Sequence, residues 1–395
     1  MIQPNRKDPT PTSNSPLVSY ALKGLDLCWL PLQGRWSHIY HLDGRAQPNQ
    51  SVAHSDVFYT MNVLLGLARV PSVPKSINVS EIFRRNAQQL LLLPVRKYSF
   101  GMALWAAAEL DLEIPAQVSE RISAILTEKN SWKYLRAQDI GMILTGVVAQ
   151  SRKGLKGMSG KADELFNQIV SQYSWPSGLF GDASSGPRHR FASFASQVYL
   201  TIACYSYGEL KGNGLAIEIA NKCCRKLISL QGPSGEWPWF FDASQGTVMD
   251  FYEVYSVHQY GMAPAFLTLA ERHGVSEARE ALVNGFNWVF GANQLGQPML
   301  VSSKHLSLRS QVRKGELRTD KWRMLRAIRN STLRRNSGLV DPEKLEIRLE
   351  CRSYELGWIL WSFGMRLDFT KLTNHKVFSD SFPADTRNSN EAILS

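Results

Sequence analysis

One stretch of the chain gathers most of the side chains that could do chemistry. It begins as Gln231-Gly-Pro-Ser-Gly-Glu-Trp-Pro-Trp-Phe-Phe-Asp242 and resumes at Asp250-Phe-Tyr-Glu-Val-Tyr-Ser-Val-His-Gln259. The two halves combine carboxylates, a histidine and aromatic rings with a turn that contains glycine and proline. Such a mixture is typical of a concave site built on loops between helices, and it suits a hydrophobic core far less well.

Carboxylates in this stretch predict acid–base work on a glycosidic bond. Such chemistry needs one carboxyl group kept protonated by apolar surroundings and a second one that is ionised. Glu236 directly precedes Trp237-Pro-Trp239, so burial of the turn would raise its pKa. We expect Glu236 to be the acid, with Glu253 or Asp250 as the ionised partner. The structural alternative is that an aspartate here only caps a turn or a helix.

His258 opens the next helical pattern and is followed directly by Gln259. A histidine in the first turn of a helix suits a general base, or a clamp that hydrogen-bonds a sugar hydroxyl. Gln259 would add a second polar contact to the same substrate. Pro264 predicts a kink that could aim these side chains at a site. The structural alternative is a half-buried histidine whose hydrogen bonds are satisfied.

Arginines elsewhere in the chain could bind the anionic part of a substrate. Arg352 and Glu355 are three residues apart at the start of the last strong helical pattern, so they share one helix face. They could pair with each other at the rim of the fold, or grip a carboxylate or hydroxyl of a substrate. Arg188 and Arg190 form a second basic group, in the loop that follows Trp175, and suit an anionic group.

Further polar and aromatic residues stand at predicted helix ends and in loops. His54 and Asp56 lie at the mouth of an early helix, with Tyr59 on the next step. Aromatic rings are also common in the predicted loops, among them Trp237, Trp239 and Tyr255. Such rings could stack on sugars or wall a hydrophobic polyene. The structural alternative is that some of them plug the inner end of the fold.

Composition bounds the class of protein. The 395 residues are 44% hydrophobic, which is ample for a sizeable core. No apolar run is long enough to suggest a membrane span, and the first residues lack the apolar region of a signal peptide. Five cysteines, two of them adjacent at positions 223 and 224, do not form a disulfide or zinc pattern. We expect reduced thiols and a cytoplasmic location.

Positive charge is concentrated in one segment, residues 302–336. It holds eleven lysines and arginines against two acidic residues, Glu316 and Asp320, within a chain of net charge +11. Such a run is commonly a solvated face. The functional alternative is a surface that binds an acidic partner, such as an anionic glycan, a membrane surface or nucleic acid. Nucleic acid is the weakest of these because Trp322 is the one aromatic residue in the segment.

The spacing of apolar residues is helical over most of the chain, and strand-like alternation is scarce. Residues 1–16 and 379–395 are polar and predicted to be disordered, so that residues 17–378 form one domain with a basic insertion at 302–336. A helix at Ser19–Trp29 would make twelve with the eleven stronger patterns. These are Asp56–Val70, Val79–Leu93, Gly101–Leu110, Pro115–Lys129, Ala137–Ser151, Lys161–Tyr173, Phe191–Leu210, Gly214–Leu230, Val257–His273, Ser276–Phe290 and Ile347–Arg366.

About twelve consecutive helices without a βαβ rhythm leave two architectures. An α-solenoid would show a fixed repeat period, and this chain shows none. Long loops also interrupt the pattern, at Trp175–His189 and Gln231–Tyr255. Loops of that length in a compact domain are usually functional. We therefore predict an all-α (α/α)6-type toroid, with long functional loops at one rim.

Short motifs agree with a toroid. Gln231-x-x-x-Gly235-x-Trp237 resembles the QW motif of squalene cyclases and related terpenoid toroids, and Gln172 to Phe180 is a degenerate echo of it. The segment Trp288-Val-Phe-Gly-Ala-Asn-Gln-Leu-Gly296 is similar to one seen late in some six-hairpin glycosidases. Glu236-Trp-Pro-Trp and Tyr255-Ser-Val-His258 also resemble six-hairpin sugar enzymes, including N-acylglucosamine 2-epimerases. These resemblances imply the architecture more than the activity.

Three functions fit these observations. The first is a carbohydrate-active hydrolase, lyase or epimerase that acts on an acidic cytoplasmic oligosaccharide or glycan precursor, as in polysaccharide biosynthesis. The second is a terpenoid cyclase or prenyl-group enzyme, although the Asp-x-Asp-Asp and Asp-Asp-x-x-Asp motifs are both missing. The third is a non-catalytic scaffold that binds through the basic segment. No cofactor or metal is expected, because the chain has no phosphate-binding glycine loop and no HExxH motif.

Overall fold

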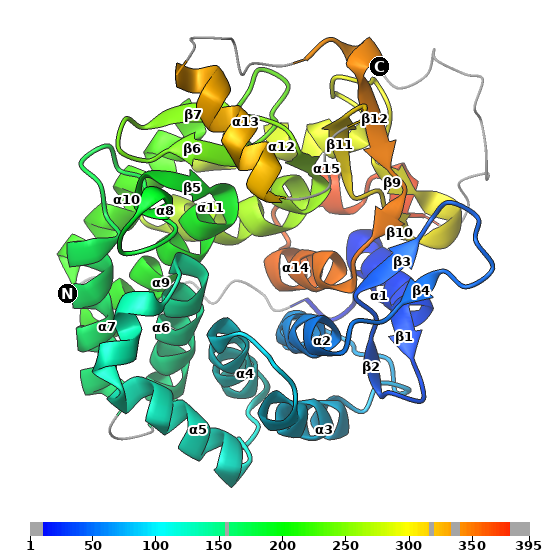
Figure 1. Ribbon diagram of the computed structural model, residues 1–395. Helices are drawn as coiled ribbons and strands as arrows, with labels where there is room; N and C mark the ends of the chain where they lie inside the picture. Colours follow the sequence, from blue (N-terminus) through cyan, green and yellow to red (C-terminus); the bar gives the residue numbers. More distant parts are fainter. Residues whose placement is uncertain (1–10, 155–157, 316–319, 333–339, 380–395) are drawn as a thin grey trace.

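A computed structural model shows helices grouped around a ring, with short strands toward one end of it (Figure 1). The structure describes residues 11–154, 158–315, 320–332 and 340–379. Most of the two terminal segments predicted to be disordered lies outside these residues, so that expectation stays a prediction. The first helix, α1 (Pro16–Cys28), begins directly after Ser15, whose side chain accepts a hydrogen bond from the Val18 N–H.

Six helices form the inner ring in the described part of the chain. Each contacts the next, and the last contacts the first, so the ring is closed. The helices are largely buried on all sides, as expected for segments that are hydrophobic all round. In chain order they are α2 (Ala53–Leu67), α4 (Lys97–Leu110), α6 (Ala137–Arg152), α9 (Phe194–Lys211), α11 (Ala263–Arg272) and α14 (Ser353–Phe363).

Outer helices alternate with the inner ones along the chain. They bury one stripe and expose the other side, as in α5, where Val118, Ile122, Ile125 and Leu126 face inward. The outer helices are α1, α3 (Val79–Leu92), α5 (Ala116–Thr127), α7 (Met158–Gln172), α10 (Gly214–Ser229) and α12 (Ala278–Phe290). The predicted (α/α)6 toroid is therefore confirmed, and the twelve predicted helices correspond to these six inner and six outer helices.

Glycines allow neighbouring inner helices to approach closely. A β-carbon at Gly101 of α4 would lie 2.5 Å from the backbone nitrogen of Ile143 in α6. A β-carbon at Gly66 of α2 would lie 2.3 Å from the carbonyl oxygen of Gly357 in α14. Backbone contacts this close need residues without a side chain. The two glycines thus shorten the distance between α4 and α6 and between α2 and α14.

The described strands all lie in loops that lead from an outer helix into the next inner helix, at the N-terminal ends of the inner helices. We call this end the mouth of the toroid. The sheets are β1 (Trp29–Leu30) with β2 (Arg35–Trp36); β3 (Ile39–His41) with β4 (Asn49–Gln50) and β13 (Glu350–Cys351); β5 (Phe191–Ser193) with β6 (Phe240–Asp242) and β7 (Thr247–Asp250); β8 (Val254–Tyr255) with β11 (Ser310–Arg313) and β12 (Leu345–Arg348); and β9 (Leu300–Val301) with β10 (Leu306–Ser307).

Two predicted helix starts fall in strands. The last inner helix begins at Ser353 and not at Ile347, because residues 345–348 pair with β11 as strand β12. Residues 191–193 likewise form β5, and α9 begins at Phe194. In both places strand pairing across the mouth overrides the local helical spacing. The helix predicted at Val257–His273 opens with a π-helical turn, His258–Met262, before α11.

The basic segment is only partly a solvated face. Its described residues contribute β10, β11 and a helix, α13 (Asp320–Thr332), that crosses the sheet β5–β6–β7 in Figure 1. Arg309 and Arg323 are buried, whereas Trp322 and Leu325 on α13 are 59% and 55% exposed. The segment therefore covers part of the mouth with some of its arginines turned inward.

Candidate functional site

The mouth of the toroid gathers a cluster of tyrosine, histidine and arginine side chains. We call His38, Tyr59, Arg309, Arg352 and Tyr354 the mouth cluster. Tyr59 and Tyr354 come from the N-terminal turns of α2 and α14, and Arg352 is the residue just before α14. His38 precedes β3, and Arg309 precedes β11. All except Arg309 are partly exposed. Ring closure thus brings four distant segments to one point.

Arg352 is the centre of this cluster. Its Nη1 lies 3.2 Å from His38 Nε2 and 3.3 Å from the Tyr59 hydroxyl. The Tyr59 ring lies against the Tyr354 ring at a centroid distance of 4.5 Å. A second guanidinium, that of Arg309, donates to the Tyr354 hydroxyl at 2.9 Å. Two cationic groups therefore lie beside two phenols and an imidazole.

The imidazole of His38 is neutral in these surroundings. Burial lowers its pKa to about 3, and the nearby guanidiniums of Arg352 and Arg309 add to this shift. A guanidinium can only donate, so Nε2 of His38 accepts from Arg352 and carries the lone pair. Arg352 therefore occupies the lone pair of the imidazole, which can accept a proton only when the guanidinium turns to another anion.

The sequence left open whether Arg352 and Glu355 pair with each other or bind a substrate group. In the structure each of them pairs with another residue. Arg352 pairs with Glu350 at 3.0 Å. Glu355 is fully buried, where it forms an ion pair with Arg309 and accepts from the Tyr260 hydroxyl at 2.7 Å. Glu355 thus supports the mouth cluster from below, through Arg309, and does not face a substrate itself.

The predicted ionised carboxylates, Asp250 and Glu253, are each enclosed by arginines. Asp250 accepts hydrogen bonds from Arg313 at 2.7 and 3.0 Å and from Arg326 at 3.2 Å. Glu253 pairs with Arg323 at 2.5 Å and Arg348 at 3.2 Å. Both carboxylates are about 1% exposed. Such buried pairs anchor the basic segment to the mouth, and their oxygens are occupied.

Glu236 has the environment expected of a protonated acid. Burial raises its pKa, as the neighbouring tryptophans predicted. Its Oε2 accepts from the Ser234 N–H at 2.9 Å, and Oε1 has no hydrogen-bond partner among the described residues. No hydrogen bond joins Glu236 to Asp250 or Glu253 among the described residues, but two catalytic carboxyl groups act several ångströms apart. Their roles as acid and ionised partner stay predictions.

Between these carboxylates lies Tyr252. Burial raises the pKa of its hydroxyl to about 12, and the charges of Glu236 and Asp250 both add to the rise. Its ring also lies under the Arg313 guanidinium at 4.9 Å. The tyrosine thus separates the Glu236 turn from the arginine-bound carboxylates.

The QW-like motif fastens its turn to the outer helix α12. Gln231 Nε2 donates to the carbonyl oxygens of Gly235 and Ala281, at 2.8 and 3.0 Å. Trp237 is fully buried and lies 5.5 Å from the Phe194 ring. These contacts give the motif a structural role at this position.

His258 stands in the first turn before α11, as predicted, but it is buried. Its ring lies between Phe194 at 4.6 Å and Tyr255 at 5.0 Å. Burial lowers its pKa to about 3, with a further contribution from Arg309. Gln259, also buried, donates to the Tyr255 carbonyl oxygen at 3.2 Å. This arrangement fits the buried-histidine alternative, and a role in proton transfer stays a prediction.

The remaining predicted binding residues lie around the sheet β5–β6–β7. Arg188, in the short helix α8 (Pro187–Arg190), pairs with Asp182, and Arg190 pairs with Asp242 at 2.6 Å. Trp239 is buried and stacks on Phe240, with the Arg323 guanidinium 4.9 Å from its ring. These side chains are engaged within the protein and do not reach the mouth cluster.

Sequence reasoning missed His38 and treated Arg309 only as part of the charged run. His38 stands in Trp36-Ser-His and carries no motif. Its contact with Arg352 joins residues 314 positions apart. Arg309 is one of eleven basic residues, and no local signal distinguishes it. Tyr59 and Arg352 were candidates from the sequence, but the start of the helix that follows Arg352 was predicted six residues too early.

The described residues contain no candidate for a membrane-spanning helix or for a metal site. No helix there is both long and apolar enough to cross a membrane. No group of three or more histidine, cysteine, aspartate or glutamate side chains in the described part is placed to hold a metal ion. All five cysteines are buried and free, as the sequence predicts for reduced thiols.

Comparisons with known proteins bear on the fold. No protein-family model matches the chain, and no curated protein is similar enough to count as a relative. Three solved structures share the architecture. An unsaturated glucuronyl hydrolase from Bacillus sp. GL1 is 11% identical, with 90% of this chain and 96% of that chain covered and a TM-score of 0.55. A possible member of the GH105 family from Salmonella enterica is 10% identical, with 92% and 98% covered and a TM-score of 0.55.

The third is the Lin0763 protein from Listeria innocua, at 11% identity, with 88% of this chain and 95% of that chain covered and a TM-score of 0.53. At such identities the likeness shows the fold alone. The predicted resemblance to six-hairpin glycosidases is thereby confirmed for the (α/α) toroid. The resemblance to terpenoid cyclases is not tested by these structures.

Proposed function

We propose that this protein is a carbohydrate-active enzyme that acts on an acidic sugar by proton transfer at the carbon next to the carboxylate. The outcome would be elimination or epimerisation. The observation that carries the proposal is the contact of Arg352 with both His38 Nε2 and the Tyr59 hydroxyl. One guanidinium there joins a neutral imidazole and a phenol at a partly exposed position.

The chemistry follows from these groups. A uronate carboxylate that binds Arg352, with Arg309 behind Tyr354, would have its charge neutralised, which makes the adjacent C–H bond more acidic. Once the carboxylate takes the Arg352 guanidinium, the lone pair on His38 Nε2 is released from that hydrogen bond and accepts the proton. In elimination the neighbouring C–O bond breaks, a carbon–carbon double bond forms, and Tyr59 protonates the departing oxygen. In epimerisation a proton returns to the same carbon from the opposite face.

Hydrolysis is a second candidate, supported by the raised pKa of Glu236. It requires an ionised carboxylate or an activated water across the bond from the acid. Asp250 and Glu253 are enclosed by arginines, which occupy the carboxylate oxygens that hydrolysis would require. The geometry therefore favours proton transfer at the mouth cluster over hydrolysis at the Glu236 turn.

An acidic oligosaccharide or glycan precursor in the cytoplasm, as in polysaccharide biosynthesis, is the substrate that this proposal names. The surplus of arginines at the mouth supports the acidic character, and the five free cysteines are compatible with a reducing compartment. In the prenyl-group alternative, the QW-like motif would have a functional role besides holding its turn against α12. In the scaffold alternative, the exposed Trp322 and Leu325 on α13 would meet an acidic partner or an anionic membrane.

The test uses purified protein with uronate-containing oligosaccharides and three readouts. Ultraviolet absorbance detects the unsaturated product of elimination, proton NMR in deuterium oxide detects exchange at the carbon next to the carboxylate, and a reducing-end assay detects cleavage. Arg352→Ala and Tyr59→Phe should lose the first two signals. Arg84→Gln and Tyr134→Phe change an exposed arginine and an exposed tyrosine, and serve as matched controls.

New reducing ends without unsaturation or deuterium exchange, lost in Glu236→Gln and retained in Tyr59→Phe, would replace the proposal by hydrolysis. A thermal-shift screen separates the remaining alternatives. A ligand at a hundred times its Kd stabilises by about 2.7 kcal/mol. Stabilisation by prenyl diphosphates alone would favour the terpenoid alternative. Binding to anionic vesicles without any turnover would favour the scaffold.

A further inference from the structure

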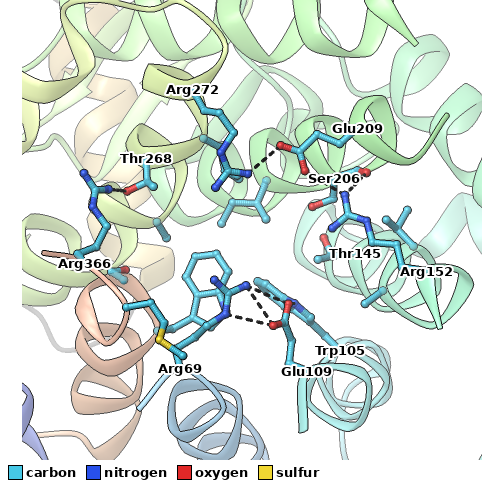
Figure 2. Close-up of a pocket in the computed structure, with 18 residues that line it drawn as sticks. Arg69, Trp105, Glu109, Thr145, Arg152, Ser206, Glu209, Thr268, Arg272 and Arg366 are labelled. Carbon is cyan, nitrogen blue, oxygen red and sulfur yellow. Dashed lines mark hydrogen bonds and ion pairs between the residues drawn. The ribbon is translucent and has the colours of Figure 1, made fainter. Parts of the chain in front are cut away.

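The end of the toroid opposite the mouth holds a cavity that the proposed function does not use. Its volume is about 250 Å³, and its walls come from the C-terminal halves of inner helices (Figure 2). Tyr354 at the mouth and Ser362 at the cavity are eight residues apart along α14. That separation is roughly 12 Å at 1.5 Å per residue. The cavity and the mouth cluster are therefore distinct places.

Helical spacing explains why there is room in this cavity. On α6, Thr145, Ala149 and Arg152 line it at intervals that place them on one helix face. On α11, Ala265 and Arg272 repeat the pattern. Each helix thus presents small side chains in the interior and an arginine one or two turns later, toward its C-terminal end. The small side chains leave space that larger ones would fill.

The charges around the cavity are unbalanced. Four arginines and two glutamates line it. Arg152 and Arg272 belong to α6 and α11, whereas Arg69 and Arg366 follow the ends of α2 and α14 (Figure 2). The imbalance is clearest at Glu209, which pairs with Arg152 at 3.0 Å, with Arg272 at 3.1 Å and with His273 at 3.0 Å. Arg272 is 59% exposed and bonds Glu209 through one nitrogen, so most of its guanidinium can meet a ligand.

The other two arginines are also held at the wall. Arg69 donates to Glu109 at 3.1 and 3.2 Å, and Arg366 donates to Asp368 at 2.7 and 2.8 Å and also to the Thr268 hydroxyl. Inner helices end here, and the carbonyl groups at helix C-termini favour cationic side chains. That effect accounts for arginines at the wall, but it does not require two of them to share one carboxylate.

Aromatic rings form part of the same wall. The ring centroids of Trp105 and Trp361 are 5.2 Å apart, and the Arg69 guanidinium lies 5.1 Å from the Trp361 ring. The buried Trp361 Nε1–H has no hydrogen-bond partner among the described residues. Tryptophan beside arginine is the combination that binds a ring carrying an anionic substituent.

We propose that this cavity binds a small anionic ring compound, a sugar acid or a sugar phosphate, at a second site. Arg272 and Arg152 hold the anionic group near the opening. The tryptophan wall receives the ring, and the small side chains of α6 and α11 set its size. This site stands independently of the activity at the mouth, because none of its lining residues belongs to the mouth cluster.

Calorimetric titration of the full chain tests the proposal, with Arg352→Ala as the background so that the mouth cluster does not contribute. The probes are glucuronate, glucose 6-phosphate and uncharged glucose. One of the two anions should bind at least tenfold more tightly than glucose, and the better anion distinguishes a carboxylate from a phosphate. Arg272→Gln should weaken that binding about tenfold. Arg84→Gln, an exposed and paired arginine elsewhere, should not.

Ala149→Leu supplies a second variant, since it narrows the cavity without changing charge, and it should also weaken anion binding about tenfold. Thermal unfolding of each variant verifies that the fold is retained. Equal binding of glucose and both anions, or binding unchanged in Arg272→Gln and Ala149→Leu, would overturn the proposal. Loss of turnover without loss of this binding in Arg352→Ala keeps the second site separate from the proposed function.

Discussion

Both ends of the toroid contain carboxylates shared by two arginines, but the surroundings differ. At the mouth, Glu253 is 1% exposed and lies between Arg323 and Arg348. At the opposite end, the Glu209 side chain is 22% exposed, and its partners Arg152 and Arg272 are 44% and 59% exposed. The same set of charges is thus enclosed at one end and open to solvent at the other.

This difference decides what the charges can do. A buried ion must be fully paired, because removing it from water is costly, so breaking a buried pair is strongly destabilising. An exposed pair contributes little to stability and can exchange its partner for a ligand. We infer that the buried pairs of the mouth hold its loops in place. The mouth cluster and the far cavity both present an arginine that is partly exposed, Arg352 and Arg272.

The largest expected effect is on activity at the mouth. Arg352→Ala removes the group that joins His38 and Tyr59, so kcat/KM for a uronate substrate should fall roughly 10⁴-fold, through lost positioning and lost charge stabilisation. The measurement is steady-state kinetics with ultraviolet detection or deuterium exchange. A loss below tenfold would remove the mouth cluster from the reaction.

The next effect is on stability, and it tests the contrast directly. Glu253→Ala leaves the buried Arg323 guanidinium and the partly exposed Arg348 guanidinium without their carboxylate, and should lower the free energy of unfolding by about 4 kcal/mol. Denaturant titration measures this change. The surface variant Glu81→Ala, at an exposed pair with Arg84, should cost less than about 1 kcal/mol. Equal costs for the two variants would show that the buried pairs do not anchor the mouth.

A smaller effect concerns pH. The pKa of His258 is about 3 in the folded protein and about 6.5 in an unfolded chain. Between these values the unfolded state binds more protons, so the free energy of unfolding falls as pH falls from about 6.5 toward 3. At pH 5 this histidine should account for a loss of about 2 kcal/mol. Denaturant titrations at pH 7 and pH 5 should show a shallower fall for His258→Gln than for wild type.

The rate of the proposed reaction should not fall with pH in the way that the free energy of unfolding does. In the proposed reaction His38 is the base, and its pKa of about 3 keeps it unprotonated well below neutral pH. The acid limb of kcat/KM should therefore stay flat from pH 7 to pH 5. A decline that follows a single protonation near pH 6.5 would show that another group accepts the proton.

The smallest effect on stability belongs to the far end. Glu209→Gln acts at a partly exposed carboxylate and should change the free energy of unfolding by about 1 kcal/mol or less. Because it releases Arg152 and Arg272, it should also tighten the binding of the anion at the cavity. Titration calorimetry of this variant beside Arg272→Gln gives opposite signs if the proposal holds. Weaker binding in both variants would mean that Glu209 belongs to the ligand site.

Much of the fold could be predicted from local pattern. Apolar spacing identified the helices because a helix that faces a core repeats its apolar residues along one stripe, as in α5. The places where this failed, before Ser353 and at Phe191–Ser193, are places where a distant strand offers backbone pairing. Local spacing carries no information about such partners.

The candidate site divides in the same way. The sequence marked Arg352, Tyr59 and the raised pKa of Glu236, because a residue at a helix start and a carboxyl beside tryptophans are local facts. It did not mark His38, whose partner is 314 residues away. Nor could it separate arginines that enclose a carboxylate from arginines that face solvent, since both look alike in a charged run.

The sequence by itself determined the helices, the long loops between them and the supply of arginines at both ends. Only the tertiary structure decided which charges are buried, that Glu355 pairs with Arg309 and Arg352 with Glu350, and that Arg352 meets His38 and Tyr59. The physical reason is that helical period is set by neighbours along the chain. Burial and ion pairing are set by closure of the ring, which brings residues together across hundreds of positions.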